Sequence, residues 1–267
     1  MTIEYTGAGD PARSLALLWR TKEKSSRKGK PDLSVDRVVR AAIEIADTDG
    51  LAALSMRRVA ERLGVGTMSL YTYVPGKAEL LDLMLDLVYG EPARPAEVPG
   101  GWRARLELIA RERWALYQRH PWMLYVATSR PALGPNVTAA YEYELGAIDG
   151  IGLTDLEMDS VVTLVSGHVH GAARGAAEAT QAEQRTGMTD EQWWWAHAPY
   201  LSKVMDATRF PISSRVGTAA GEAYGAAYNA EQAFEFGLQR ILDGIETLID
   251  SRAPQARSSP GTPQRDT

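Results

Sequence analysis

The chain contains 267 residues, carries a formal net charge of −5 and has no cysteine. The lack of cysteine excludes disulfide frameworks, thiolate metal sites and cysteine nucleophiles, and it indicates a reducing, cytoplasmic location. No apolar run approaches the roughly 20 residues that cross a bilayer, and the first ten residues are polar, so we expect neither a membrane partner nor a secretory leader.

The charge is distributed unevenly along the chain. The segment 20–77 contains 12 Lys and Arg against 7 Asp and Glu, whereas the residues that follow it carry a net charge of −9. A basic segment joined to an acidic body predicts that one part binds a polyanion and that the other has a separate task.

Residues 1–33 are expected to be disordered, with a basic stretch between Arg20 and Lys30. One interpretation of this stretch is a solvated tail. The other is an arm that follows phosphates or enters a minor groove beside the main contact. The sequence leaves both open.

Apolar side chains recur at helical spacing from residue 34 onward. Ser34 and Ser55 are expected to cap two helices, and Gly50 and Gly64 to end them. Further helices are predicted at 67–73, 77–89 and, beyond a Pro- and Gly-rich connection at 91–101, at 102–120, 136–150, 155–182, 192–207 and 230–251. Period-two alternation is absent, so the predicted fold class is all-α, with a disordered tail at 252–267.

Two short helices joined by a Gly-containing turn, with a supporting helix before them, have the geometry of a helix-turn-helix. The second helix of such a motif must be short and must expose one polar face to base edges. Leu70 and Val74 are expected to point back to the core. The residues expected on the outward face are Thr67, Met68, Ser69, Thr72 and Tyr73.

Three short motifs follow one another in this region: Leu63-Gly64-Val65, then Leu70-Tyr71-x-Tyr73-Val74, then Lys77-x-x-Leu80-Leu81. With them, the segment 54–85 resembles the DNA-binding region of the tetracycline-repressor (TetR) family. It departs from the family at Tyr73-Val74, where His-Phe is usual, and at Gly66, where Ser is common. More loosely, 120–137 and 234–249 resemble the C-terminal domain of the subgroup nearest the tetracycline repressor.

The resemblance implies a three-helix DNA-binding domain at 34–76 and a helical regulatory and dimerisation domain at 77–251, in which the helix 77–90 links the two. It implies a homodimer that binds double-stranded DNA at a two-fold-symmetric operator and dissociates when a small-molecule effector enters the regulatory domain. Repression is expected, although the sequence leaves activation open, as it does a response to a protein partner.

By position, the resemblance also implies which residues meet DNA. Tyr71 and Lys77 are implied as phosphate contacts, which position a protein without reading sequence. In the alternative interpretation, the rings of Tyr71 and Tyr73 pack in the core. DNA contact and core packing are compatible, because the ring can pack while the hydroxyl reaches out. The implied base contacts are Arg57, Thr67, Met68, Ser69 and Tyr73, with Thr72 beside them.

Aromatic residues gather at 120–125 and at Trp193–Trp195, as a small-molecule site would require. Aromatic residues at helical spacing are more often plain core, and Arg174 with Glu178 forms an alternative i,i+4 pair. Three consecutive Trp cannot share one helix face, so at least one should meet a partner, a pocket or solvent. The candidate ligand contacts are His120, Met123, Tyr125, His168, Arg174 and Trp194.

Gly167, Gly171 and Gly175 recur every four residues in the helix predicted at 155–182. Glycine inside a helix costs roughly 1 kcal/mol relative to alanine, so the three need compensation. We expect the close approach of another helix, within the domain or across a subunit interface, in preference to a ligand niche. The apolar stripe of the helix 230–251 suits a helical bundle.

No catalytic, metal or cofactor site is predicted. His168 and His170 lie two positions apart on a helix, so their side chains diverge by about 200° and cannot share one ion. The sequence shows no nucleophile-base arrangement and no Gly-rich phosphate loop after a strand. We therefore expect a regulator and not an enzyme.

Overall fold

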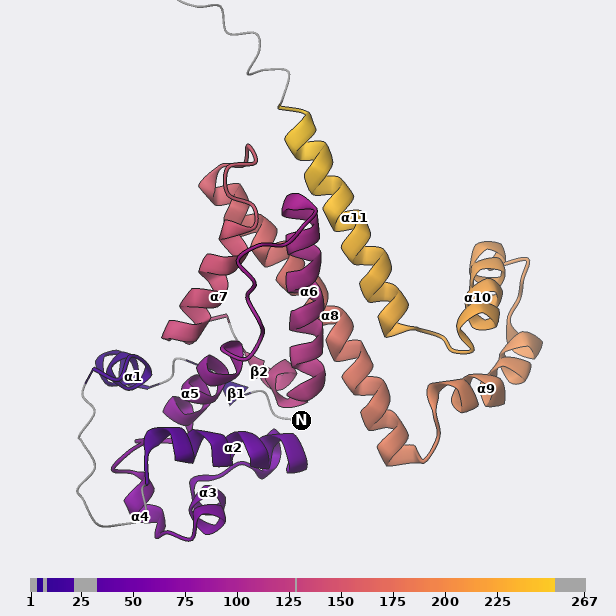
Figure 1. The fold of residues 1–267 in the computed structure, drawn as a ribbon. Helices are drawn as coiled ribbons and strands as arrows, with labels where there is room; N and C mark the ends of the chain where they lie inside the picture. Colours follow the sequence, from indigo (N-terminus) through magenta and orange to yellow (C-terminus); the bar gives the residue numbers. More distant parts are fainter. Residues whose placement is uncertain (1–3, 7–8, 22–32, 128, 253–267) are drawn as a thin grey trace, which may run out of the picture.

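The computed structural model describes residues 4–6, 9–21, 33–127 and 129–252. This part of the chain is built almost wholly from helices (Figure 1), which confirms the all-α prediction. The elements, with η for a 3-10 helix, are β1 (Glu4–Tyr5), α1 (Pro11–Leu18), α2 (Val35–Asp49), η1 (Leu51–Ala53), α3 (Met56–Leu63), α4 (Thr67–Leu70), α5 (Lys77–Tyr89), α6 (Gly101–Arg119), η2 (Pro121–Tyr125), β2 (Val126–Ala127), α7 (Pro135–Gly146), α8 (Asp155–Thr186), α9 (Asp190–Val204), α10 (Pro211–Tyr224) and α11 (Ala230–Asp250). The strands β1 and β2 pair in parallel over two residues.

Local signals set the boundaries of the first helices. The hydroxyl of Ser34 accepts a hydrogen bond from the backbone N–H of Arg37, and that of Ser55 accepts one from Arg58, both at 3.2 Å. These contacts confirm the two predicted N-caps. Gly64 adopts the left-handed conformation with φ of 67°, which a residue without Cβ takes without strain, and α3 ends there.

The helices α2 to α5 form the N-terminal domain, at the bottom of Figure 1. The supporting helix α2 packs against η1, α3 and α5. Val38 and Ile45 of α2 and Val59 of α3 are fully buried between these helices. The apolar stripes of these helices thus form one small core together. This packing fixes the angle between α2 and the two helices of the helix-turn-helix.

The helix α5 joins this domain to the larger one. Its Asp86 is buried and accepts hydrogen bonds from the backbone N–H groups of Asn136 at 2.9 Å and Val137 at 3.0 Å. Burial raises the pKa of the Asp86 carboxyl, and these hydrogen bonds oppose the rise. A carboxylate of α5 therefore caps the first turn of α7 across the domain boundary.

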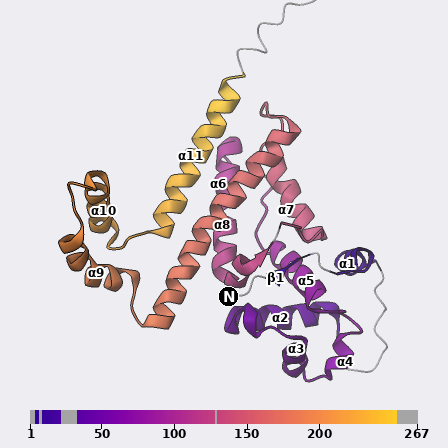
Figure 2. The ribbon, with the colours of Figure 1, turned by 180° about the vertical axis from the view of Figure 1, so that it is seen from behind.

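The C-terminal domain is arranged around α8, which spans 32 residues and packs against both α6 and α11 (Figures 1 and 2). The buried stripe of α11 consists of Phe234, Leu238, Leu242 and Ile245. This stripe follows the spacing that the sequence predicts. No helix among the described residues is long and apolar enough to cross a membrane.

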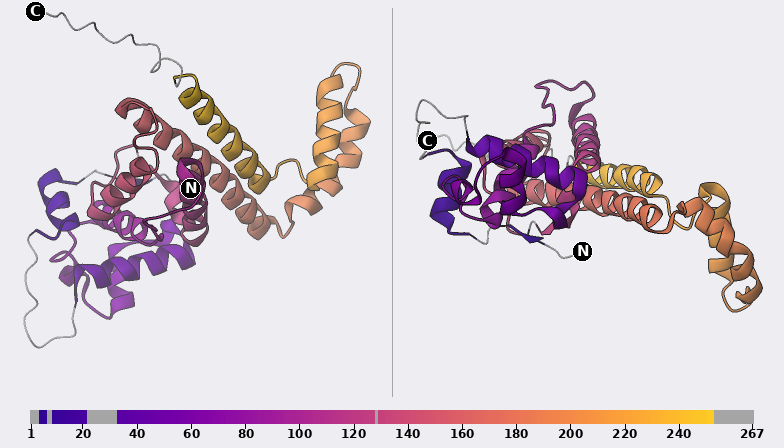
Figure 3. Two further views of the ribbon diagram at one scale, coloured as in Figure 1. Left: turned by 45° about the horizontal axis from the view of Figure 1, so that its top comes forward. Right: turned by 90° about the horizontal axis from the view of Figure 1, so that it is seen from below.

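The helices α9 and α10 form an arm that projects from the body between the ends of α8 and α11 (Figures 1 and 3). No residue of α9 is buried, and Trp194 lies against Gly221 of α10. Trp193 and Trp195 are 46% and 52% exposed, so the three consecutive tryptophans do not share a buried face, as expected. Other exposed apolar residues of the arm are Tyr200, Leu201, Val204, Phe210, Ile212 and Val216.

Several predicted elements require correction. The prediction that 1–33 is disordered is wrong for 4–5, which form β1, and for 11–18, which form α1: Leu18 is buried, and the indole N–H of Trp19 donates to the carbonyl of Leu133 at 2.8 Å. The rest of the basic stretch, 22–30, lies outside the described residues, as does the tail 253–267. The helix expected near 67–73 ends at Leu70, and the one expected to reach residue 150 ends at Gly146. Helix α10 is not predicted, because its Gly- and Ser-rich sequence lacks a continuous apolar stripe.

Candidate DNA-binding surface and ligand cavity

Helix α4 is short, and its inner side packs against the rest of the N-terminal domain. Leu70 and Val74 are fully buried, which confirms the predicted inward face. Met68 on the other side is 79% exposed. Of the predicted outward residues and Tyr71, those exposed are Met68, Ser69, Tyr71 and Thr72, whereas Thr67 and Tyr73 are half-buried. The helix therefore presents a polar surface of the size that enters a major groove.

The two arginines in the first turn of α3 are held differently. Arg57 is 82% exposed and pairs at 2.8 Å with Glu61, one turn further along α3. Arg58 donates at 2.6 Å to Asp49 at the end of α2. An exposed i,i+4 pair contributes only about 0.3–0.5 kcal/mol, so the pair of Arg57 with Glu61 costs little to break. Arg58 instead ties α3 to the supporting helix.

The first turn of α5 has the features of a helix end that can bind an anion. Lys77 is its first residue, and the N-cap residue Gly76 provides no side-chain hydrogen bond. The N–H groups of a first helical turn and the helix dipole favour a phosphate at such a position. Tyr71 is 40% exposed, whereas the ring of Tyr73 packs against the core. Packing is thus observed for Tyr73, and the phosphate contacts of Tyr71 and Lys77 stay predictions.

His120, a candidate ligand contact, lies buried at the boundary between the domains. Its Nδ1 is 2.8 Å from Oδ1 of Asp47 on α2, and its Nε2 is 3.1 Å from Oε2 of Glu91, just after α5. The indole N–H of Trp122 donates to the same Asp47 oxygen at 2.8 Å. The neighbouring Met123 is 3% exposed and belongs to the core. This cluster joins the domains.

Of the other candidate ligand residues, Tyr125 and Arg174 lie together, whereas His168 and Trp194 have other neighbours. The hydroxyl of Tyr125 accepts from the amide of Gln181 at 2.6 Å, and the guanidinium of Arg174 lies 5.9 Å from the Tyr125 ring centre. Arg174 also pairs with Glu178 at 3.0 Å, as the alternative interpretation has it. His168 stacks on Phe234 of α11, whereas Trp194 belongs to the arm. The six candidates therefore do not converge on one site.

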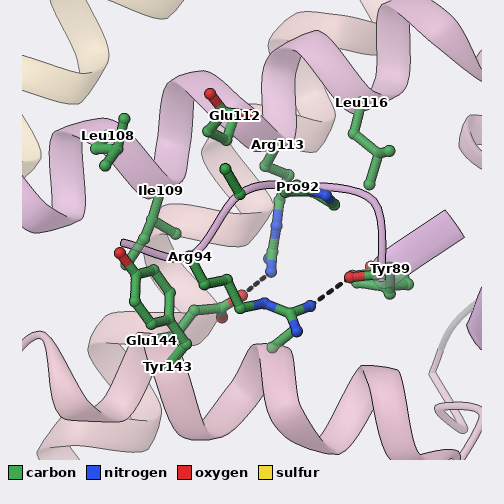
Figure 4. Close-up of a pocket in the computed structure, with 12 residues that line it drawn as sticks. Tyr89, Pro92, Arg94, Leu108, Ile109, Glu112, Arg113, Leu116, Tyr143 and Glu144 are labelled. Atoms are coloured by element: carbon green, nitrogen blue, oxygen red, sulfur yellow. Dashed lines mark hydrogen bonds and ion pairs between the residues drawn. The ribbon is translucent and has the colours of Figure 1, made fainter. Parts of the chain in front are cut away.

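A cavity lies elsewhere, between α6, α7 and the segment that connects α5 to α6 (Figure 4). Its volume of about 40 Å³ admits a few water molecules. Sites for drug-sized ligands are larger, about 300–1,000 Å³. The lining residues are Tyr89, Pro92, Ala93, Arg94, Leu108, Ile109, Glu112, Arg113, Leu116, Ala140, Tyr143 and Glu144. None of the six predicted ligand contacts is among them.

An ion pair between Arg113 of α6 and Glu144 of α7 forms the polar wall of this cavity. The two side chains are 13% and 8% exposed, and Arg113 also donates to the hydroxyl of Ser166 on α8. Burial raises the pKa of Glu144, while the positive charges of Arg113 and Arg94 act against that rise. Removal of one partner would leave an unpaired buried charge, so the pair is a fixed feature of the wall.

Sequence reasoning missed this ion pair, although the chain carries a signal for it. Arg113 stands within the buried stripe of α6, between Ala110 and Leu116. Glu144 stands four residues after Ala140 on the buried side of α7. Charged residues are almost never buried unless they are paired, so a charge within an apolar stripe indicates a partner on a facing helix.

Two family profiles match the chain. The profile "Bacterial regulatory proteins, tetR family" matches residues 38–84, and "Tetracyclin repressor-like, C-terminal domain" matches residues 94–249. The chain belongs to the TetR family. The TetR assignment covers both domains, including the C-terminal one, where the motifs of the sequence are weaker.

Proteins of the TetR family are similar to this chain over most of its length. The HTH-type transcriptional repressor DrrR1 of Streptomyces coeruleorubidus is 51% identical over 252 residues, or 94% of this chain and 91% of the relative. The tetracycline repressor protein class E of Escherichia coli is 24% identical over 224 residues, or 82% and 94%. The structure of ActR from Streptomyces coelicolor in complex with actinorhodin is similar with a TM-score of 0.68 at 30% identity, covering 80% of this chain and 96% of that chain.

The two sides of α4 predict opposite effects of substitution. Leu70→Ala should destabilise the domain by about 2–5 kcal/mol, because it removes a fully buried side chain. Met68→Ala, on the exposed side, should change the free energy of unfolding by less than about 0.5 kcal/mol and weaken specific DNA binding. Urea unfolding and fluorescence anisotropy with labelled DNA measure the two effects. Equal destabilisation by both variants would contradict the outward orientation of α4.

Proposed function

We propose that this TetR-family protein is a homodimeric transcriptional repressor that a small-molecule effector releases from a two-fold-symmetric operator. The observation that carries the proposal is the outward surface of α4, which Leu70 and Val74 hold from below. The name of the relative that is 51% identical, a transcriptional repressor, supports repression over activation. A regulator of this kind works beside the chromosome, in the cytoplasm, and requires no catalytic chemistry.

The proposed reading surface combines α4 with the first turn of α3. Arg57 suits guanine, because a guanidinium bonds both acceptors of its major-groove edge. Met68 offers apolar contact to a thymine methyl group, and Ser69 and Thr72 offer hydroxyls. Tyr71 and Lys77 flank this surface as the proposed phosphate contacts.

The proposed dimer interface lies on the outer faces of α8 and α11. On α8, Leu156 and Leu164 are 81% and 52% exposed, and they share a face with Gly167 and Gly171. Apart from the chain neighbours and the nearby backbone of α8 itself, no atom of the described residues comes within 4 Å of a Cβ built on either glycine. On α11, Phe236 is 60% exposed. A second copy that packs the same faces about a two-fold axis would cover these apolar residues and explain the cost of the glycines.

The cavity between α6 and α7 is the proposed effector site. Half of its twelve lining residues are aliphatic, and the others are the guanidinium groups of Arg94 and Arg113, the phenol groups of Tyr89 and Tyr143 and the carboxylates of Glu112 and Glu144. Such a lining fits a mostly apolar molecule that carries several oxygen acceptors. Similar ActR structures contain actinorhodin and (S)-DNPA, which supports a small-molecule effector for this chain.

Two substitutions separate base reading from phosphate binding. Arg57→Ala should weaken binding to the selected operator by about 1–3 kcal/mol and lower the ratio of specific to non-specific affinity. Lys77→Ala should weaken binding to all DNA alike and reduce the slope of log K against log salt by about one per subunit. Anisotropy titrations at several salt concentrations, on an operator obtained by selection from random DNA, measure both. An unchanged specificity ratio in Arg57→Ala would remove that residue from the reading surface.

The dimer interface predicts a selective effect at Gly171. Because the protomer leaves space around it, Gly171→Glu should fold as a protomer but lose dimerisation through the charge it places in the interface. Light scattering after size-exclusion chromatography should show a monomer, and operator affinity should fall at least tenfold. Ala139→Glu, on an exposed position of α7, is the matched control and should stay dimeric. A dimeric Gly171→Glu protein would place the interface elsewhere.

Effector release can be tested on preformed complexes of the dimer with labelled operator. A screen of mostly apolar, oxygen-rich compounds, beginning with actinorhodin, should find molecules that raise the operator Kd at least tenfold. Leu108→Ala removes apolar contact from the cavity lining and should raise the concentration for half-release several-fold. A compound that releases wild type and Leu108→Ala at the same concentration would bind at another place.

A further inference from the structure

The proposed effector cavity has a volume of about 40 Å³, so an effector can enter only when part of the lining moves. This step rests on the proposed function of the cavity. The α6 and α7 sides of the lining belong to packed helices, and their Arg113–Glu144 pair is nearly buried. The remaining side consists of Pro92 to Arg94, which belong to the connection between α5 and α6 (Figure 4). We call this segment the roof of the cavity.

The roof is the lining part that is least firmly packed. No residue of the connection 91–100 is buried, and none of it is helical. Two side chains act as latches: the guanidinium of Arg94 donates to the carbonyls of Tyr89 and, at 3.5 Å, Asn136, and the hydroxyl of Tyr143 donates to the carbonyl of Pro95 at 3.0 Å. A segment with few buried contacts opens at a lower free-energy cost than a packed helix, so the roof is the part that yields.

Movement of the roof reaches Glu91 directly, because Glu91 is the residue before it. The Oε2 atom of Glu91 lies 3.1 Å from Nε2 of His120 and 3.5 Å from Nε of Arg119. Pro92 and Pro95 have fixed φ angles, so the segment between them has little freedom to absorb a displacement. Lifting the roof therefore withdraws the Glu91 carboxylate from the buried imidazole.

His120 continues this connection into the DNA-binding domain. Its other ring nitrogen lies 2.8 Å from Asp47, in the last turn of α2. Two residues later, Asp49 accepts from Arg58 of α3 at 2.6 Å. A path thus runs from the cavity roof to α3, through the polar contacts of Glu91, His120 and Asp47, the α2 backbone between Asp47 and Asp49, and the contact of Asp49 with Arg58.

We propose that Glu91, His120 and Asp47 are positioning residues that couple the roof of the effector cavity to α2. With the roof closed, Glu91 and Asp47 hold the two ring nitrogens and fix the last turn of α2 against the regulatory domain. With the roof lifted, His120 loses its contact with Glu91, and its hydrogen bond to Asp47 changes in geometry. The last turn of α2 then shifts, so α3 and α4 leave the orientation that fits the operator. By linkage, operator binding favours the closed roof in return.

The test needs no effector, because a side chain can fill the cavity. Ala140 lines it, and an indole in its place does not fit the available volume with the roof closed. Ala140→Trp should therefore raise the operator Kd at least tenfold by forcing the roof outward. In a Glu91→Ala background the same substitution should change the Kd less than threefold, because the connection is already broken. Glu91→Gln, which keeps an oxygen acceptor for His120, should restore most of the effect.

A second set of variants opens the roof without added bulk. Arg94→Ala combined with Tyr143→Phe removes both latches and should also raise the operator Kd, again less so in the Glu91→Ala background. Glu97→Ala, an exposed position on the same connection, is the matched control and should change neither Kd nor coupling. Thermal unfolding and affinity for non-specific DNA verify that each variant is folded.

The proposed coupling would be overturned if Ala140→Trp, or the removal of both latches, changed the operator Kd by the same factor with and without the Glu91→Ala substitution. A wild-type Kd in both the Ala140→Trp protein and the protein without latches would overturn it as well. Failure of the proposed function looks different: wild-type protein itself would then select no operator from random DNA. If the protein binds its operator but the effects of the roof variants and of Glu91→Ala on Kd are additive, the proposed function stands and only the coupling through His120 is wrong.

Discussion

Two carboxylates, the partly exposed Asp47 and the buried Asp86, join the DNA-binding domain to the regulatory domain. Asp47 of α2 meets His120 and Trp122, whereas Asp86 of α5 caps the first turn of α7. Hydrogen bonds to an ionised group are short and directional, so each contact permits little sliding. Because the two contacts lie at separate places on the boundary, they restrict the rotation of one domain relative to the other as well as the distance between them. In the proposed mechanism, these contacts pass a change in the regulatory domain on to α2 and α5.

On the DNA-binding side, the structure combines a rigid inner surface with an exchangeable outer one. Leu70 and Val74 hold α4 through burial, which no DNA contact replaces. Arg57 is held by an exposed pair with Glu61, which costs little to break. For the proposed contacts with DNA, the protein would therefore have little internal structure to break.

The regulatory domain shows the same division between fixed and yielding parts. The Arg113–Glu144 pair lies in the packed interior, and its loss would leave a buried charge unpaired. The connection over the cavity has no buried residue. Beyond the cavity, α8, α11 and the arm of α9 and α10 all carry large apolar residues that are exposed in the protomer. A protomer built in this way is suited to a partner copy and to a ligand.

Local structure followed from the sequence: caps at Ser34 and Ser55, the left-handed Gly64, and the helical stripes that bury Leu70 and Val74. These features depend on interactions between residues a few positions apart, so the helix-turn-helix and the TetR resemblance were predictable. Which distant residues meet was visible only in the folded chain. Folding assigned His120 to the domain boundary, brought Arg113 to Glu144, and gave α1 a surface to pack against. Such contacts depend on how whole helices cross, and helical periodicity specifies a buried face without specifying which helix covers it.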